Sequence, residues 1–202
     1  MVINNFFTVE SKLLSSSFQA APVGLPHEDE NRLYGEHKLI QGDYSDITFP
    51  VIFKYSSGNK LNDVIDTGWA GLYLISNKML TILEENNVSG FKAYPSLIID
   101  KLGNPIKGYH GFSVTGRCGA IDYERPEIIE KSFVPNGPLV RFYKGLYVGL
   151  DQWDGKDIFL PEGNFNIIIS MRAAEVLKKA KLTNLVFRNL ADIETPLFGV
   201  LK

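Results

Sequence analysis

The sequence predicts an α+β fold of mixed β-sheets with hairpins and two principal amphipathic helices. Two segments, residues 71–94 and 165–188, lead to this prediction because both follow one plan. In each, an apolar run ends in a serine, a segment of helical periodicity follows, and a short polar turn leads into a second extended run. Elsewhere, short runs of β-branched and aromatic residues alternate with turn residues, which is typical of hairpins.

The two segments match in residue type when the second is shifted by 94 positions. The matched pairs are Ile75 with Ile169, Ser76 with Ser170, Leu83 with Leu177, Val88 with Leu182 and Ser89 with Thr183. The match predicts an internal duplication of a strand–helix–strand unit, with right-handed crossovers where the strands are parallel in one sheet. The alternative is a coincidence of common α/β patterning, since two copies are far fewer than a repeat array contains.

Both units begin with a strand and a helix start. Residues 72–75 and 167–169 are short apolar runs rich in β-branched residues, which suits strands buried on both faces. Ser76 and Ser170 follow directly. Each serine can accept a hydrogen bond from an N–H group of the first helical turn, which is worth about 1 kcal/mol.

The helical segments carry one apolar face each. The residues on these faces are Met79, Ile82 and Leu83 in the first copy, and Ala173, Val176, Leu177 and Ala180 in the second. Spacings of three and four residues predict amphipathic helices with one buried stripe. Gly90 and Asn184 lie in the turns that follow, and both residue types tolerate left-handed backbone.

The rest of the chain predicts strands and hairpins. The expected elements are a strand at 3–9, a strand at 47–55 edged by Pro50 that pairs back with 61–65, a hairpin joining 97–99 to 106–109, and strands at 112–115 and 139–148. Residues 18–46 look like a long loop, and residues 126–131 predict about one helical turn. Residues 189–202 show no strong pattern.

Composition bounds the class of protein. The 202 residues fit a single domain, 1–202, or two small packed lobes of about 1–115 and 116–202. A hydrophobic content of 45% supports a sizeable core, and a net charge of −2 argues against a nucleic-acid partner. No apolar run approaches the ~20 residues of a membrane span, and the first residues do not resemble a signal peptide. We therefore expect a cytoplasmic protein without a membrane partner.

The sequence supplies no clear catalytic or metal site. Cys118 follows Arg117, which lowers a thiol pKa when the two side chains meet, but a nucleophile needs a base and only His110 is near in sequence. A buried, unreactive Cys118 is therefore the favoured interpretation. The three histidines, His27, His37 and His110, lack metal-ligand spacing, so no metal and no cofactor are predicted.

The acidic turn at 151–157 is the candidate partner-binding site. Its carboxylates, Asp151, Asp154 and Asp157, stand at relative positions 1, 4 and 7. A helix–loop–helix calcium site uses positions 1, 3 and 5 with a glutamate at 12, so a solvated turn is favoured over calcium binding. An exposed Trp153 among these acids would make a protein-contact patch, whereas core packing of Trp153 is the alternative.

A carboxylate-dependent hydrolase is the rival class. Its acid pair would come from Glu124, Glu127, Glu130, Asp151 and Asp154, and no spacing selects two of them. The nucleophile elbow Gly-x-Ser-x-Gly, the phosphate-binding glycine loop and the dinucleotide fingerprint are all missing from the sequence. No catalytic residue is therefore predicted.

Residues 75–94 and 169–188 resemble a group of bacterial immunity proteins from polymorphic-toxin systems. In that group a strand ending in Ser leads into a helix, a turn of the Thr-Gly type and a strand with an aromatic residue; Asn184 stands where this pattern has glycine. Residues 100–106 and 153–159 share the resemblance more weakly.

The resemblance implies a non-catalytic protein that neutralises a cognate toxin by occlusion inside the producing cell. Acidic groups such as Asp151, Asp154 and Asp157 would steer it towards a basic toxin surface. An adaptor domain without a toxin partner is the third possibility.

Overall fold

The computed structural model describes residues 3–12, 14–26 and 35–197. These residues form three α-helices, namely α1 (Gly35–Gln41), α2 (Asn77–Glu85) and α3 (Met171–Lys179). The strands are β1 (Phe6–Glu10), β2 (Gln19–Val23), β3 (Val51–Ser57), β4 (Val64–Asp66), β5 (Tyr73–Ser76), β6 (Phe91–Tyr94), β7 (Ser96–Ile99), β8 (Pro105–Ile106), β9 (Tyr109–Val114), β10 (Gly116–Ile121), β11 (Glu127–Ser132), β12 (Leu139–Lys144), β13 (Val148–Gly149), β14 (Ile158–Pro161), β15 (Ile168–Ser170), β16 (Val186–Asn189) and β17 (Glu194–Pro196). The mixed sheets confirm the α+β class.

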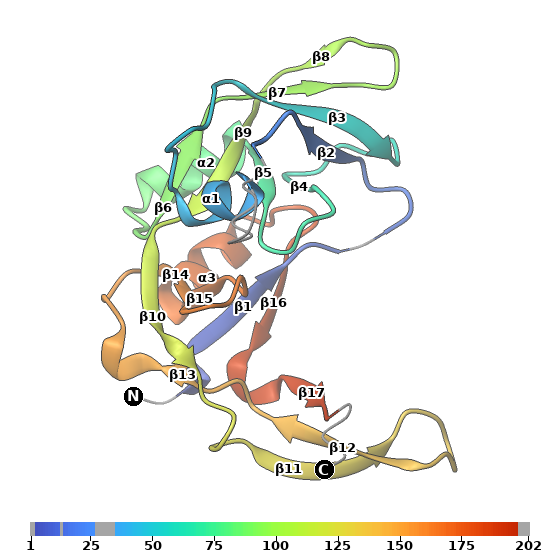
Figure 1. The fold of residues 1–202 in the computed structure, drawn as a ribbon, viewed down its shortest axis with the longest axis vertical. Helices are drawn as coiled ribbons and strands as arrows, with labels where there is room; N and C mark the ends of the chain where they lie inside the picture. The colour runs from blue at the N-terminus through green and yellow to red at the C-terminus, as the bar shows by residue number, and fades with distance from the viewer. Residues whose placement is uncertain (1–2, 13, 27–34, 198–202) are drawn as a thin grey trace.

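The strands form three sheets. An eight-stranded sheet has the order β6-β9-β5-β4-β2-β3-β7-β8, and a six-stranded sheet has the order β13-β10-β14-β15-β1-β16. A three-stranded sheet, β11-β12-β17, projects from one end of the molecule (Figure 1). We call this small sheet, with its β11–β12 connection, the arm. None of the helices in the described ranges has the length and apolarity needed to cross a bilayer.

The two predicted strand–helix–strand units are β5–α2–β6, the first unit, and β15–α3–β16, the second unit. In the first, β5 and β6 both run antiparallel to β9, which lies between them. In the second, β15 and β16 both run antiparallel to β1 in the same way. The Ser76 hydroxyl accepts from the Met79 N–H and the Ser170 hydroxyl from the Ala173 N–H, so both predicted helix caps are confirmed. Duplication as the origin of the two units stays a prediction.

Several sequence expectations are wrong. The stretch expected to be a loop contains β2 and α1, so the described residues form a short third helix besides the two predicted ones. Residues 127–132 form strand β11 and no helical turn, because cross-strand pairing with β12 decides the conformation of this short segment. β3 pairs with β2 and β7, whereas β4 pairs with β5 and β2, so the hairpin expected between 47–55 and 61–65 does not form. The hairpin around residues 100–105 is confirmed, as β7 pairs with β8.

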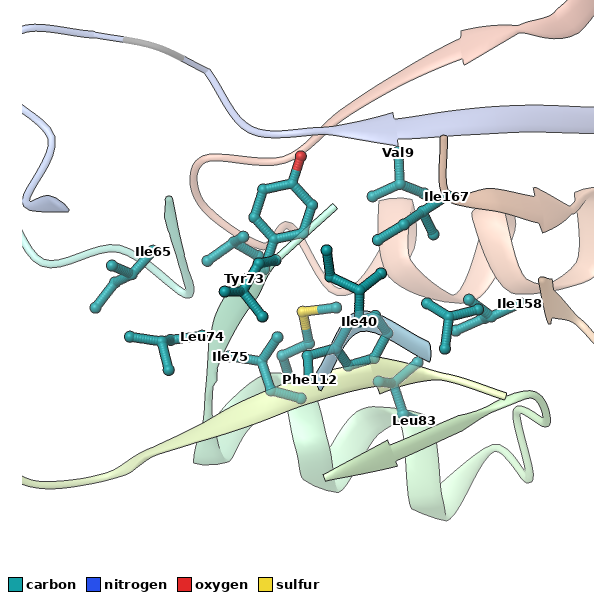
Figure 2. Close-up of a cluster of buried hydrophobic side chains, with 14 of the residues drawn as sticks. Val9, Ile40, Ile65, Tyr73, Leu74, Ile75, Leu83, Phe112, Ile158 and Ile167 are labelled. Atoms are coloured by element: carbon teal, nitrogen blue, oxygen red, sulfur yellow. The ribbon is translucent and has the colours of Figure 1, made fainter. Parts of the chain in front are cut away.

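The main core lies where the two large sheets and the three helices meet. Figure 2 shows side chains from both sheets converging there, with Val9 and Ile167 opposite Ile75 and Phe112. Most of these residues are almost fully buried, and each large aliphatic side chain buried in this way contributes about 1.5–3 kcal/mol. The eight-stranded sheet comprises β2 to β9, whereas β1, from the amino-terminal end, lies in the six-stranded sheet. The proposed lobe boundary near residue 115 stays a prediction.

A second, smaller core lies on the arm side of the six-stranded sheet. It comprises Phe6, Cys118, Leu146, Val148, Phe159, Ile168 and Leu190. The backbone N–H groups of Gly145 and Leu146 donate to the carbonyls of Ile193 and Leu190, which ties the base of the arm to this core. The arm is therefore anchored at one end and projects at the other.

Candidate functional site

The acidic turn predicted as a partner site connects β13 to β14 and begins with a short 3₁₀-helix, Leu150–Gln152. Asp151 and Asp154 are exposed, whereas Asp157 is almost fully buried. The Asp154 carboxylate accepts from the Arg117 N–H at 3.0 Å and from the Lys156 N–H at 3.1 Å, so it fixes the turn against β10. Two carboxylates of the turn therefore face solvent.

Trp153 packs against the smaller core. Its ring meets Phe6 edge-on at a centroid distance of 5.2 Å and lies 5.5 Å from Phe159. The indole N–H donates to the Lys156 carbonyl at 3.0 Å. The side chain is half-buried, so the ring mainly supports the turn from below.

Asp157 is engaged within the chain. Its carboxylate accepts hydrogen bonds from the hydroxyl groups of Ser89 and Ser170 and forms an ion pair with Arg172. Burial disfavours the charged form, but the bonds from Arg172, Ser89 and Ser170 more than compensate, so the pKa of Asp157 falls from 3.8 to about 2. The carboxylate is charged at neutral pH, and its hydrogen bonds are used within the fold.

A groove of about 880 Å³ separates the base of the arm from the acidic turn. Its lining comprises Ile3, Asn4, Arg125, Glu127, Lys144, Gly145, Tyr147, Val148, Leu150, Asp151 and Ala191. Two cations, two carboxylates and several apolar side chains thus share one open surface, with Asp151 at its edge. A second hollow on the other side of Asp151 contains Tyr123 and Glu124.

The arm exposes apolar side chains on one sheet face. Ile128 pairs across the strands with Tyr143, and Ser132 pairs with Leu139, so all four lie on the same face. Ile128 is 55% exposed and Leu139 is 69% exposed. The centroid of the Tyr123 ring lies 6.0 Å from that of Tyr143, and Tyr123 also lines the second hollow.

The charges on the arm neutralise one another. Arg141 and Glu130, which lie opposite each other on the exposed face, form an ion pair at 2.9 Å. Lys131 pairs with Glu194 on the other face and covers the ring of Phe142, which is buried. The exposed face thus carries Ile128 and Tyr143 on one side and Leu139 on the other side of an exposed ion pair, Arg141 with Glu130. We call Tyr123, Ile128, Leu139 and Tyr143 the arm patch.

The remaining candidates lie elsewhere. Cys118 is buried in the smaller core, where desolvation, with a smaller effect of the Asp154 charge, raises the pKa of its thiol to about 12. His110 bonds to the Asn77 side chain at 2.8 Å, and His37 stacks on Phe165, whereas His27 lies outside the described residues. Within the described ranges, no three His, Cys, Asp or Glu side chains gather as a metal site would require.

Sequence reasoning missed the arm patch. Pro126 and the two glutamates at 127 and 130 resembled a helix start, and this concealed the strand. The turn at Gly137-Pro138, followed by residues of high strand propensity, was the signal that could have revealed a hairpin.

Comparison with models of known protein families gives a match over most of the chain. The model of a family described as "Immunity protein family (Imm11)" matches residues 7–192, which covers both units, the acidic turn and strands β11 and β12 of the arm. No curated protein matches the chain.

Proposed function

The chain belongs to the immunity protein family Imm11, and from this premise we propose that it binds a cognate protein toxin and neutralises it by occlusion, without catalysis of its own. The proposal places this complex in the cytoplasm of a bacterial cell that makes the toxin. Its mechanism requires only a rigid surface that covers the toxin's functional site. Neither a nucleic acid nor a membrane takes part.

The arm patch is the observation that carries the proposal. A small sheet needs its apolar face to be packed for independent stability, and this face of the arm is open to water. Several large apolar side chains exposed together on one face of a folded protein commonly mark a site of protein contact. Because Arg141 and Glu130 already neutralise each other, the patch suits an apolar, uncharged area of the toxin.

The acidic turn adds long-range attraction beside the patch. Asp151 lines the groove that leads to the arm, and Asp154 lies three residues further along the exposed turn. Charges at the rim of an interface mainly raise the association rate and are screened by salt. We therefore propose a toxin surface with an apolar centre and a basic rim, in which Trp153 supports the turn and Asp157 serves the fold.

Co-expression with a candidate toxin cloned from the neighbouring genes tests the proposal. The informative variant is Ile128→Thr with Leu139→Thr, which removes apolar area but keeps residues that favour strands. Loss of two anchors should weaken toxin binding about 10- to 100-fold and abolish growth rescue.

Leu102→Thr is the matched control for the arm variant. Leu102 is 77% exposed in the β7–β8 turn, at the opposite end of the molecule from the arm (Figure 1). The control should bind and rescue like the unmodified protein, and all variants should keep their thermal midpoints. Normal rescue and binding by the arm variant would remove the arm from the interface.

The acidic turn is tested separately by association kinetics. Asp151→Asn with Asp154→Asn should slow association and flatten its dependence on salt, while dissociation changes little. Glu84→Gln, a charge removal at an exposed position of α2, is the control. An association rate equal to that of the control would discard steering by this turn.

A further inference from the structure

Two aspartates precede the two units at corresponding positions in the sequence. Asp63 precedes β4, which pairs antiparallel with β5 of the first unit. Asp157 precedes β14, which pairs antiparallel with β15 of the second unit. The two aspartates are 94 positions apart, which is the offset that aligns the units in sequence.

Each carboxylate bonds to both units. Oδ1 of Asp157 accepts from the hydroxyl of Ser170, the helix cap of the second unit, at 2.9 Å. Oδ2 accepts from the N–H and the hydroxyl of Ser89, in the turn of the first unit, both at 2.9 Å. The N–H of Asp157 in turn donates to the Ser89 hydroxyl at 3.1 Å. We call this group the Asp157 clasp.

The same contacts recur around Asp63 with the units exchanged. Oδ1 of Asp63 accepts from the hydroxyl of Ser76, the helix cap of the first unit, at 3.0 Å. Oδ2 accepts from the N–H of Thr183 at 2.8 Å and from its hydroxyl at 2.9 Å, and Thr183 belongs to the second unit. The N–H of Asp63 donates to the Thr183 hydroxyl at 2.7 Å. This group is the Asp63 clasp.

The turns that enter the clasps correspond as well. Gly90 and Asn184, again 94 positions apart, both have positive φ. A Cβ atom on Gly90 would lie 2.0 Å from the carbonyl oxygen of Ile158, whereas the side-chain amide of Asn184 donates to the carbonyl of Val64 at 2.8 Å. Val64 and Ile158 share the same offset, so the glycine and the asparagine meet equivalent carbonyls in two different ways.

From this atom-for-atom correspondence we propose that the two units form an internal pseudo-dimer. In it, a side chain of each unit bonds to the aspartate that precedes the other unit, and these two reciprocal clasps set the orientation of the two large sheets. Shared α/β patterning accounts for similar local elements. It does not explain why, in both clasps, Oδ1 bonds to the unit that follows the aspartate and Oδ2 bonds to the other unit, with all partners 94 positions apart.

The cation beside the carboxylate differs between the two clasps, and this difference sets their order of opening. Arg172 donates from Nε to Asp157 at 3.1 Å and also reaches the carbonyls of Asn86 and Asn87, at the carboxyl end of α2. A cation is favourable at that end of a helix. Its counterpart Lys78 lies 3.7 Å from Asp63. The Asp63 clasp is therefore the weaker one and opens first.

Amide exchange in the full-length chain, followed by NMR, tests the reciprocity. Asp157→Asn should speed exchange at the Ser89 amide, in the opposite unit, by about tenfold or more, and leave the Thr183 amide protected. Asp63→Asn should do the reverse. Asp100→Asn is the control, because Asp100 accepts the N–H groups of Leu102 and Asn104 within its own turn and its loss should act only there.

Milder variants keep the test decisive if an aspartate variant fails to fold. Ser89→Ala should speed exchange at the Asp157 amide, and Thr183→Ala should do so at the Asp63 amide, since each loses its acceptor hydroxyl. The thermal midpoint should fall further for Asp157→Asn than for Asp63→Asn. Faster amide exchange only in the unit that follows a substituted aspartate, or only in the unit that contains a substituted Ser89 or Thr183, would refute the reciprocal clasps. Equal decreases in thermal midpoint for Asp157→Asn and Asp63→Asn would refute the opening order.

Discussion

Replacing Asp157 with asparagine should destabilise the protein in a way that disappears in acid. At neutral pH the ionised carboxylate is held by Ser89, Ser170 and Arg172. The asparagine side chain would keep the shape of the carboxylate but would lose the charge and one acceptor oxygen. The difference between the two proteins therefore reports the ionised state of a single clasp.

The size of the effect follows from the pKa. The pKa of Asp157 in the folded chain is about 2, against an ordinary value of 3.8. At about 1.4 kcal/mol per unit, this difference corresponds to about 2 kcal/mol of stability. Because the folded pKa is the lower one, this contribution is complete above about pH 5 and is lost as the pH falls through 4 towards 2.

Urea unfolding of both proteins at several pH values between 7 and 2 measures the difference. We expect the gap in unfolding free energy to be about 2 kcal/mol at pH 7 and to shrink towards zero near pH 2. Asp151→Asn, at an exposed position of the acidic turn, serves as the control for a general effect of removing a carboxylate. A gap that stays constant over the whole pH range would show that the charge of Asp157 contributes nothing to the fold.

Two further changes probe the fold. Gly90→Ala would place a methyl group 2.0 Å from the Ile158 carbonyl oxygen at a position with positive φ, so we expect a loss of about 3–5 kcal/mol in urea unfolding. Asn184→Gly loses one hydrogen bond at the equivalent turn and should cost about 1 kcal/mol, and equal losses for the two variants would contradict the close contact. The Cys118 thiol, buried and with its pKa raised to about 12, should resist maleimide at pH 8 until the chain unfolds; rapid labelling of the folded protein, followed by mass spectrometry, would contradict its burial.

The local plan of the units could be read from the sequence because it depends on short-range physics. A serine directly before an apolar helical stripe caps its own helix, and Ser76 and Ser170 both do so in the structure. The hairpin around residues 100–105 was equally accessible, since Asp100 accepts the N–H groups of its own turn.

The arm could not be predicted from the sequence in this way. Residues 127–132 have no local preference strong enough to decide between a helical turn and a strand, and pairing with β12 decided it. The exposure of Ile128 and Leu139 depends in turn on which face of that sheet meets the body. Both properties arise from contacts with residues distant in sequence, which periodicity does not encode.

The acidic turn shows the same division between sequence and structure. The sequence by itself determined three evenly spaced aspartates around Trp153, and the 94-residue offset that relates Asp157 to Asp63. Only the tertiary structure decided that Asp151 and Asp154 face water while Asp157 binds the opposite unit. The reason is that identical carboxylates differ only in what surrounds them, and Ser89, from the first unit, reaches Asp157 only after the two units have packed together.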